Sequence, residues 1–241
     1  GYYGAAVKIK NILVSIVTSL GTVLLPRAAY YIEHQQMDEF KKLSRKALNF
    51  VFIIASPMMI YFILFAKQGI FFLSGDAFAP AVVPMQLIMP TLLLIGITNI
   101  LGIQILVPLG YEKAVLVSEI VGAVIDLVVN ALLIPVYQSS GAAIGTLLAE
   151  FAVMVVQFVA LKNEIKTAFS DIKYLKIILA IILASLASFW VTALNLHVFI
   201  TLVISAIFFF GVYGLVLIIM KEKLVIEILT QIFNKLKHKS A

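Results

Sequence analysis

The chain has 241 residues, of which 63% are hydrophobic and only 12% are charged, and its mean hydropathy is +1.11. Ordinary soluble domains are roughly half apolar and about a quarter charged, so this composition excludes a soluble globular protein. The formal net charge is +6, there is no cysteine, and the three histidines are scattered, which predicts no disulfide and no metal site. We therefore expect an integral membrane protein.

Apolar blocks recur along the chain between short polar breaks, and a spanning helix needs about 20 such residues. They predict an all-α fold, a polytopic bundle of about seven transmembrane helices. In chain order the predicted spans are 4–28, 47–66, 84–108, 114–134, 141–161, 176–194 and 197–220. Because the chain begins at Gly1 without an initiator methionine, we expect it to be a fragment that lacks its N-terminal part.

The first predicted span carries a polar stripe. At about 100° per residue, six polar residues share about a third of the helix circumference. They are Lys8, Asn11, Ser15, Thr18, Ser19 and Thr22. Lys10 points the opposite way, and we expect it to snorkel to the outer headgroups. An unpaired polar side chain on lipid costs several kcal/mol, so the stripe predicts contact with protein or with water.

The next polar faces lie on the third, fourth and fifth predicted spans. Their members are Thr91, Thr98, Asn99 and Gly102, then Ser118, Glu119, Gly122, Asp126 and Asn130, then Thr146, Glu150 and Gln157. Asp126 and Glu150 lie near the middle of their spans, where ionisable residues are rare and indicate function by default. The alternative is that both acids are protonated structural groups. Glu119 lies close to a helix end, where solvation accounts for its charge.

Four prolines, Pro57, Pro84, Pro90 and Pro108, lie in or at the ends of spans and predict kinks or helix ends.

Basic residues are strongly skewed to one side of the predicted topology. That side carries Arg27, Lys41, Lys42, Arg45, Lys46, Lys113, Lys162, Lys166, Lys173, Lys176, Lys221, Lys223, Lys235, Lys237 and Lys239. The other side has Lys67 alone, and Lys8 and Lys10 lie inside the first span. Because cytoplasmic loops retain basic residues, we expect a cytoplasmic C-terminus and an outer Gly1, with no nucleic-acid partner.

The segment 221–241 repeats apolar residues at helical spacing, with lysine and glutamate on the opposite arc. This pattern predicts a cytoplasmic amphipathic basic helix that lies in the membrane interface and contacts membrane lipids.

Several runs together resemble a known family. They are "GYYGAAVKIKN", "TSLGTVLLPR", "FFLSGDAFAPAVVPMQLIMP", "ITNILGIQILVPLGYEKA" and "GAVIDLVVNALLIPVYQSSGAAIGTLLAE". In order and spacing they are similar to the C-terminal lobe of bacterial polysaccharide flippases of the Wzx type. The superfamily also holds multidrug extrusion antiporters and the lipid II flippase. The resemblance covers about residues 1–165.

The resemblance implies two six-helix lobes around a central cavity, with two extra helices in some members. On that pattern, 1–165 is the C-terminal transporter lobe without its first helix, 166–220 is the additional pair, and 221–241 is the tail. The implied function is export of an oligosaccharide linked to undecaprenyl pyrophosphate, such as an O-antigen precursor of lipopolysaccharide. It would move by alternating access across the bacterial inner membrane, with the missing N-terminal lobe as partner. Asp126 stands where the family often has asparagine.

In this interpretation Lys8 and Arg27 meet the anionic pyrophosphate, and Asn11, Ser15 and Asn99 bind sugars. Asp126 and Glu150 bind the coupling ion, a proton or sodium. No catalytic chemistry and no cofactor are required, so we expect no enzyme activity.

Two alternatives remain. A multidrug cation antiporter of the same superfamily would favour a more aromatic and acidic cavity. A membrane glycan polymerase or glycosyltransferase would need acids or arginines at an aqueous surface, and the longest outer break, 67–83, offers only Asp76 and Lys67.

Overall fold

The computed structural model describes residues 1–161, 169 and 172–239, and every regular element in these ranges is helical. They form two compact units, Gly1–Ile172 (unit 1) and Lys173–Ala241 (unit 2), which are described separately below. Five helices of the described part are long and apolar enough to cross a membrane, and a bent pair makes a sixth. The expected all-α polytopic bundle is therefore confirmed. The predicted domain boundary at 165/166 lies outside the described residues.

Unit 1 begins with two long helices, α1 (Tyr2–Glu33) and α2 (Met37–Leu64). A tight turn joins them, with Gln35 at a φ of 56°. The predicted break 29–46 is therefore wrong in extent, since helix occupies most of it. Its charged residues are good helix formers, and the first turns of α2 bury an apolar stripe that includes Phe40, Ala47 and Leu48.

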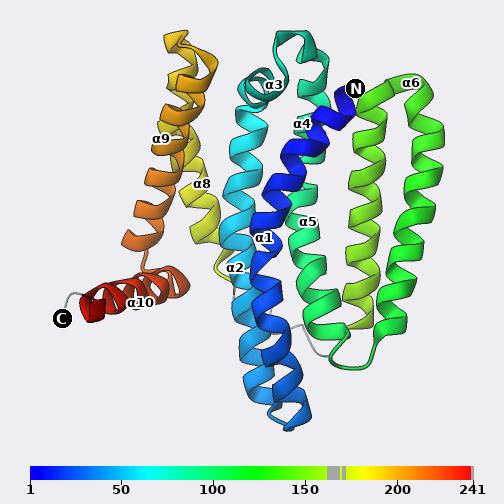
Figure 1. Ribbon diagram of the computed structural model, residues 1–241, viewed down its shortest axis with the longest axis vertical. Coiled ribbons are helices and arrows are strands. Elements are labelled where there is room, and N and C mark those ends of the chain that lie inside the picture. Colours follow the sequence, from blue (N-terminus) through cyan, green and yellow to red (C-terminus); the bar gives the residue numbers. More distant parts are fainter. Residues whose placement is uncertain (162–168, 170–171, 240–241) are drawn as a thin grey trace. The chain divides into compact units, whose positions relative to one another are not determined.

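The middle of unit 1 begins with the short helix α3 (Ala66–Ser74) and continues as a broken span. This span runs through the 3₁₀ helix η1 (Asp76–Ala81), α4 (Val82–Ile88), α5 (Thr91–Thr98) and the π-helix η2 (Asn99–Leu106). The segments Asp76–Ile88 and Thr91–Leu106, on either side of Pro90, are bent by 43° relative to each other. This bend confirms the kink expected at Pro90. Met85, Ile88 and Leu92 are fully buried here, because this segment contacts α1, α2 and α6 (Figure 1).

The helix α6 (Glu112–Ala160) folds back on itself at Gln138, whose φ of 48° and ψ of −121° are not helical (Figure 1). Its two legs, 112–137 and 139–160, correspond to the predicted fourth and fifth spans. Glycines bring the legs together, as small residues do between membrane helices. A Cβ built on Gly122 would lie 2.5 Å from Val153 Cγ2, and one on Gly141 would lie 2.5 Å from the Leu133 carbonyl oxygen.

Unit 2 contains α8 (Tyr174–Phe189), the 3₁₀ helix η3 (Trp190–Leu194), α9 (Val198–Ile219) and α10 (Lys223–Lys239). The two long helices pack through residues spaced by four. These are Ala180, Ala184 and Ser188 on α8, and Thr201, Ser205, Phe209, Tyr213 and Leu217 on α9. Lys176 Nζ donates to the carbonyl of Met220 at 2.7 Å and lies 3.6 Å from Glu222 Oε2, which joins the start of α8 to the end of α9.

The elements of unit 1 alternate between two ends. The N-terminus, α3 and the fold-back of α6 lie at one end, and the turn between α1 and α2 lies at the other (Figure 1). From the basic-residue skew we predict that the first end is extracellular. Single cysteines at Asp76 or Gln138, both exposed, should react with an impermeant thiol reagent added to intact cells, whereas cysteines at Gln35 or Lys113 should not. Labelling of the second pair alone would reverse the orientation.

Candidate functional site

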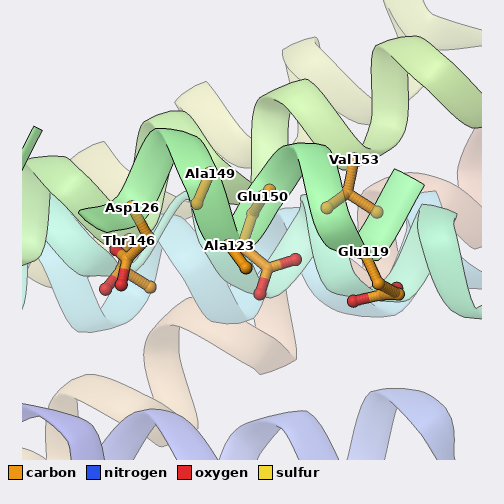
Figure 2. Close-up of a pocket in the computed structure, with 8 residues that line it drawn as sticks. Glu119, Ala123, Asp126, Thr146, Ala149, Glu150 and Val153 are labelled. Carbon is orange, nitrogen blue, oxygen red and sulfur yellow. The ribbon is translucent and has the colours of Figure 1, made fainter. Parts of the chain in front are cut away.

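An acidic cavity of about 240 Å³ opens between the two legs of α6 (Figure 2). It is lined by Glu119, Gly122, Ala123, Asp126, Thr146, Ala149, Glu150 and Val153. The two acids predicted for ion coupling, Asp126 and Glu150, therefore lie on one cavity although they belong to different spans. Glu119, which the sequence placed in solvent at a helix end, is exposed and lines the same cavity.

Two buried oxygen atoms of the first leg lack hydrogen-bond donors among the described residues: one belongs to Asp126, which lines the cavity, and one to Asn130, one helical turn further along. Asp126 Oδ1 and Asn130 Oδ1 are both buried and accept no hydrogen bond from any residue that the structure describes. Both face Gly145 on the opposite leg: a Cβ built there would lie 3.3 Å from Asp126 Oδ1 and would also meet Asn130 Oδ1. Figure 2 shows Asp126 beside Thr146, with Glu150 and then Glu119 further along the legs. Buried oxygens of this kind can bind a cation or a proton.

Asn130 was part of a predicted polar face but was not predicted as a site residue. The sequence could have indicated it, because Asn130 follows Asp126 by four residues and residues at that spacing are neighbours on a helix. Within the described ranges, no three acidic or histidine side chains form a group that could hold a metal ion.

The helix α1 borders this site. Tyr3 Oη lies 2.7 Å from Thr146 Oγ1, which connects α1 to the second leg of α6. Lys10 is half-buried, whereas Lys8 is exposed. That Lys10 snorkels to the outer headgroups stays a prediction. Lys10 lies seven residues after Tyr3, and residues so spaced share a helix face.

The polar stripe of α1 lies on the surface of unit 1. Lys8, Asn11, Ser15 and Ser19 are exposed, whereas Ile9, Leu13 and Val17 on the other side of the helix are buried. Ser15 and Ser19 donate hydrogen bonds to carbonyl groups of their own helix. Thr22, the last member of the predicted stripe, has a side chain outside the described part of the structure.

Two basic members of the predicted cargo site, Lys8 and Arg27, are exposed, as is the amide of Asn11. Their side chains make no hydrogen bond or ion pair with any described residue. Because Lys8 and Asn11 lie on a helix long and apolar enough to span the membrane, their face requires water or another protein part beside it.

Asn99 does not join that surface. Its Oδ1 atom is buried, and a Cβ built on Gly21 would lie 2.5 Å from it. Gly21 belongs to the buried side of α1, away from the exposed stripe. The structure thus groups Lys8, Asn11 and Ser15 on one surface, and it places Asn99 inside the contact between α1 and η2.

No family model matches the sequence. The chain is similar to an uncharacterized membrane protein of Methanocaldococcus jannaschii, MJ1068, with 25% identity over 212 residues. The matched region covers 88% of this chain but only 42% of that protein, so the chain spans less than half the length of this relative. The fold and this similarity together identify a multi-pass membrane protein.

Proposed function

We propose that this chain is one lobe of a two-lobed transporter that moves a lipid-linked oligosaccharide from the inner to the outer leaflet. The observation that carries the proposal is the exposed face of Lys8 and Asn11 on α1, a helix long and apolar enough to span the membrane, where neither side chain contacts a polar partner among the described residues. In a complete transporter this stripe would border a water-filled cavity between two lobes. The membrane protein that this chain resembles is matched over only 42% of its length, which leaves room for a second lobe in that relative.

The cargo of such a transporter is an isoprenoid lipid that bears a pyrophosphate and a glycan, with undecaprenyl pyrophosphate as the carrier implied by the resemblance. The anionic headgroup cannot cross about 30 Å of hydrocarbon unassisted. Lys8 and Arg27 are exposed cations towards opposite ends of α1, so they would offer charge compensation at two depths. Asn11 and Ser15 between them would hydrogen-bond sugar hydroxyls.

An ion gradient would drive transport, and the acidic cavity would bind the coupling ion. Asp126 and Glu150 would bind a proton or sodium ion, and each charge that moves through 100 mV of membrane potential gains about 2.3 kcal/mol. Binding in one conformation and release in the other would couple this energy to the movement of one lobe against its partner. The proposed location is the cytoplasmic membrane, with the C-terminus inside.

A multidrug cation antiporter is the second candidate, because the cavity is lined by Glu119, Asp126 and Glu150. The two functions differ in cargo, so one experiment separates them. The complete protein should restore surface glycan in a flippase-deficient strain without changing resistance to cationic dyes. The opposite result would establish the antiporter.

We predict that residues 1–241 alone will not restore export in the same strain, since alternating access requires two lobes around a shared site. The measurement is surface glycan on immunoblots or by lectin binding, at matched levels of membrane-inserted protein. Full export by this chain alone would refute the assignment to a single lobe.

A further inference from the structure

Unit 2 carries its acidic and basic residues at one end of its two long helices. Residues 177–220, which include most of α8 and all of α9, contain no aspartate, glutamate, lysine or arginine. The charged residues of the unit are therefore confined to 173–176 and 221–239. They are Lys173, Lys176, Lys221, Lys223, Lys235, Lys237 and Lys239, against Glu222 and Glu227. This end of the α8–α9 pair is strongly basic, and the other end has none of these residues.

A largely buried ion pair holds the start of α8 against the end of α9. Lys176 Nζ donates hydrogen bonds to the Met220 carbonyl at 2.7 Å and to the Lys221 carbonyl at 3.2 Å. The same nitrogen lies 3.6 Å from Glu222 Oε2. Glu222 is only 4% exposed, so its charge is compensated by Lys176 and does not face water. Lys173 lies one helical turn before Lys176 and belongs to the same junction of α8, α9 and α10.

The turn that ends α9 places Lys221 in an unusual backbone conformation. The backbone N–H of Lys221 donates to the Ile218 carbonyl at 3.0 Å, and that of Glu222 donates to the Leu217 carbonyl at 2.9 Å. This pair of hydrogen bonds is the Schellman helix end, whose left-handed position is usually occupied by glycine. Lys221 occupies it here, with a φ of 52°. A lysine side chain therefore stands where glycine would be conformationally easier.

Three lysines of this junction face outward. The side chains of Lys173, Lys221 and Lys223 are exposed and make no hydrogen bond or ion pair with any described residue. Glu227, also exposed, lies one turn after Lys223 on α10 and offsets part of its charge. Glu222 adds little opposing charge, because Lys176 compensates it. The exposed surface that these residues form is therefore positive.

The junction lies where a spanning helix leaves the membrane. The helix α9 is long and apolar enough to span, and it ends at Ile219, directly before the turn that contains Lys221. Figure 1 shows α10 running across the end of α9 instead of continuing it. Because the end of a spanning helix lies at the membrane boundary, the exposed lysines are at the level of the lipid headgroups.

We infer that Lys173, Lys221 and Lys223 form a binding site for the headgroups of anionic phospholipids, such as phosphatidylglycerol. In the predicted orientation these lipids belong to the cytoplasmic leaflet. Lysines at a membrane surface attract lipids with a net negative charge. A zwitterionic lipid carries a choline beside its phosphate and gains less from the same lysines. The bound lipid holds the end of α9 and the start of α10 at a fixed depth, whatever cargo the protein moves.

The test titrates the complete protein in detergent with dioleoyl phosphatidylglycerol and, separately, with dioleoyl phosphatidylcholine. Native mass spectrometry measures the bound lipid. The unmodified protein should bind phosphatidylglycerol more tightly than phosphatidylcholine. Lys173→Gln and Lys221→Gly should each weaken phosphatidylglycerol binding by about fivefold, and the double variant by about twenty-fivefold, as expected for lysines near an anionic lipid surface. Phosphatidylcholine binding should not change.

The Lys221→Gly variant also separates binding from folding, because glycine suits the left-handed conformation at this position. Its melting temperature should not fall, although its affinity for phosphatidylglycerol does. Lys173→Arg keeps the charge and should keep the affinity. The matched control is Lys113→Gln, which removes an exposed lysine at the start of α6 on the same predicted side of the membrane. It should leave the affinity unchanged.

Equal affinity of the unmodified protein for the two lipids overturns the inference. So does an unchanged affinity for phosphatidylglycerol in the double variant, or an equal loss in Lys113→Gln. If the double variant does not yield a monodisperse protein, Lys173→Gln with Lys223→Gln replaces it with the same expectation.

Discussion

Lys8→Ala in the complete protein should lower oligosaccharide export by about tenfold or more, because a hydrogen bond to a charged group contributes about 1.5–3 kcal/mol. Lys8 is exposed, and its side chain makes no hydrogen bond or ion pair with a described residue, so its removal breaks no contact known within the chain. Membrane insertion and abundance should therefore stay near those of the unmodified protein. The measurement is surface glycan per unit of inserted transporter.

Two further variants sharpen this experiment. Lys8→Arg keeps the positive charge and should retain part of the activity, although its planar group cannot reproduce the geometry of an ammonium. Lys67→Ala removes an exposed lysine at the start of α3 and should leave export intact. An export loss that follows protein abundance, or equal losses in Lys8→Ala and Lys67→Ala, would show that Lys8 does not meet the cargo.

Gly141→Ala should lower the thermal stability of the complete protein strongly, because at Gly141 the second leg of α6 packs directly against the backbone of the first leg. A Cβ at this position would lie 2.5 Å from the Leu133 carbonyl oxygen and 2.9 Å from the Ile134 nitrogen. Both are backbone atoms, so the new methyl group cannot be accommodated by a side-chain rotation. We expect a cost of about 1–3 kcal/mol, typical of overpacking. The measurement is the melting temperature in detergent, followed by size-exclusion chromatography.

The matched control is Gly211→Ala in α9. Apart from the nearby backbone of α9 itself, no atom of the described residues lies within 4 Å of the Cβ that it would add, so the same chemical change is made without a clash. Its melting temperature should stay within a degree or so of the unmodified protein, or rise slightly through better helix propensity. Equal destabilisation by both variants would mean that the close approach of the legs does not hold in the membrane.

Local patterns were enough to predict the class of the fold. The lengths of the apolar blocks predicted the spanning helices, and the turn residues around Gln138 separated the two legs of α6. Periodicity also identified Asp126 and Glu150 as acids in mid-span, because it depends only on neighbours along one helix. The break predicted between α1 and α2 was too long, since a charged amphipathic segment remains helical where α2 buries one of its faces.

Apolar periodicity along the chain is sufficient to predict the helices and the angles between side chains within each helix. The rotation of each helix against its neighbours could be read only from the folded structure. That rotation half-buries Lys10, leaves Lys8 exposed and places Asn99 against Gly21. A helical pattern gives only the relative angles within one helix, whereas the side that faces inward is set by close packing with helices distant in the chain.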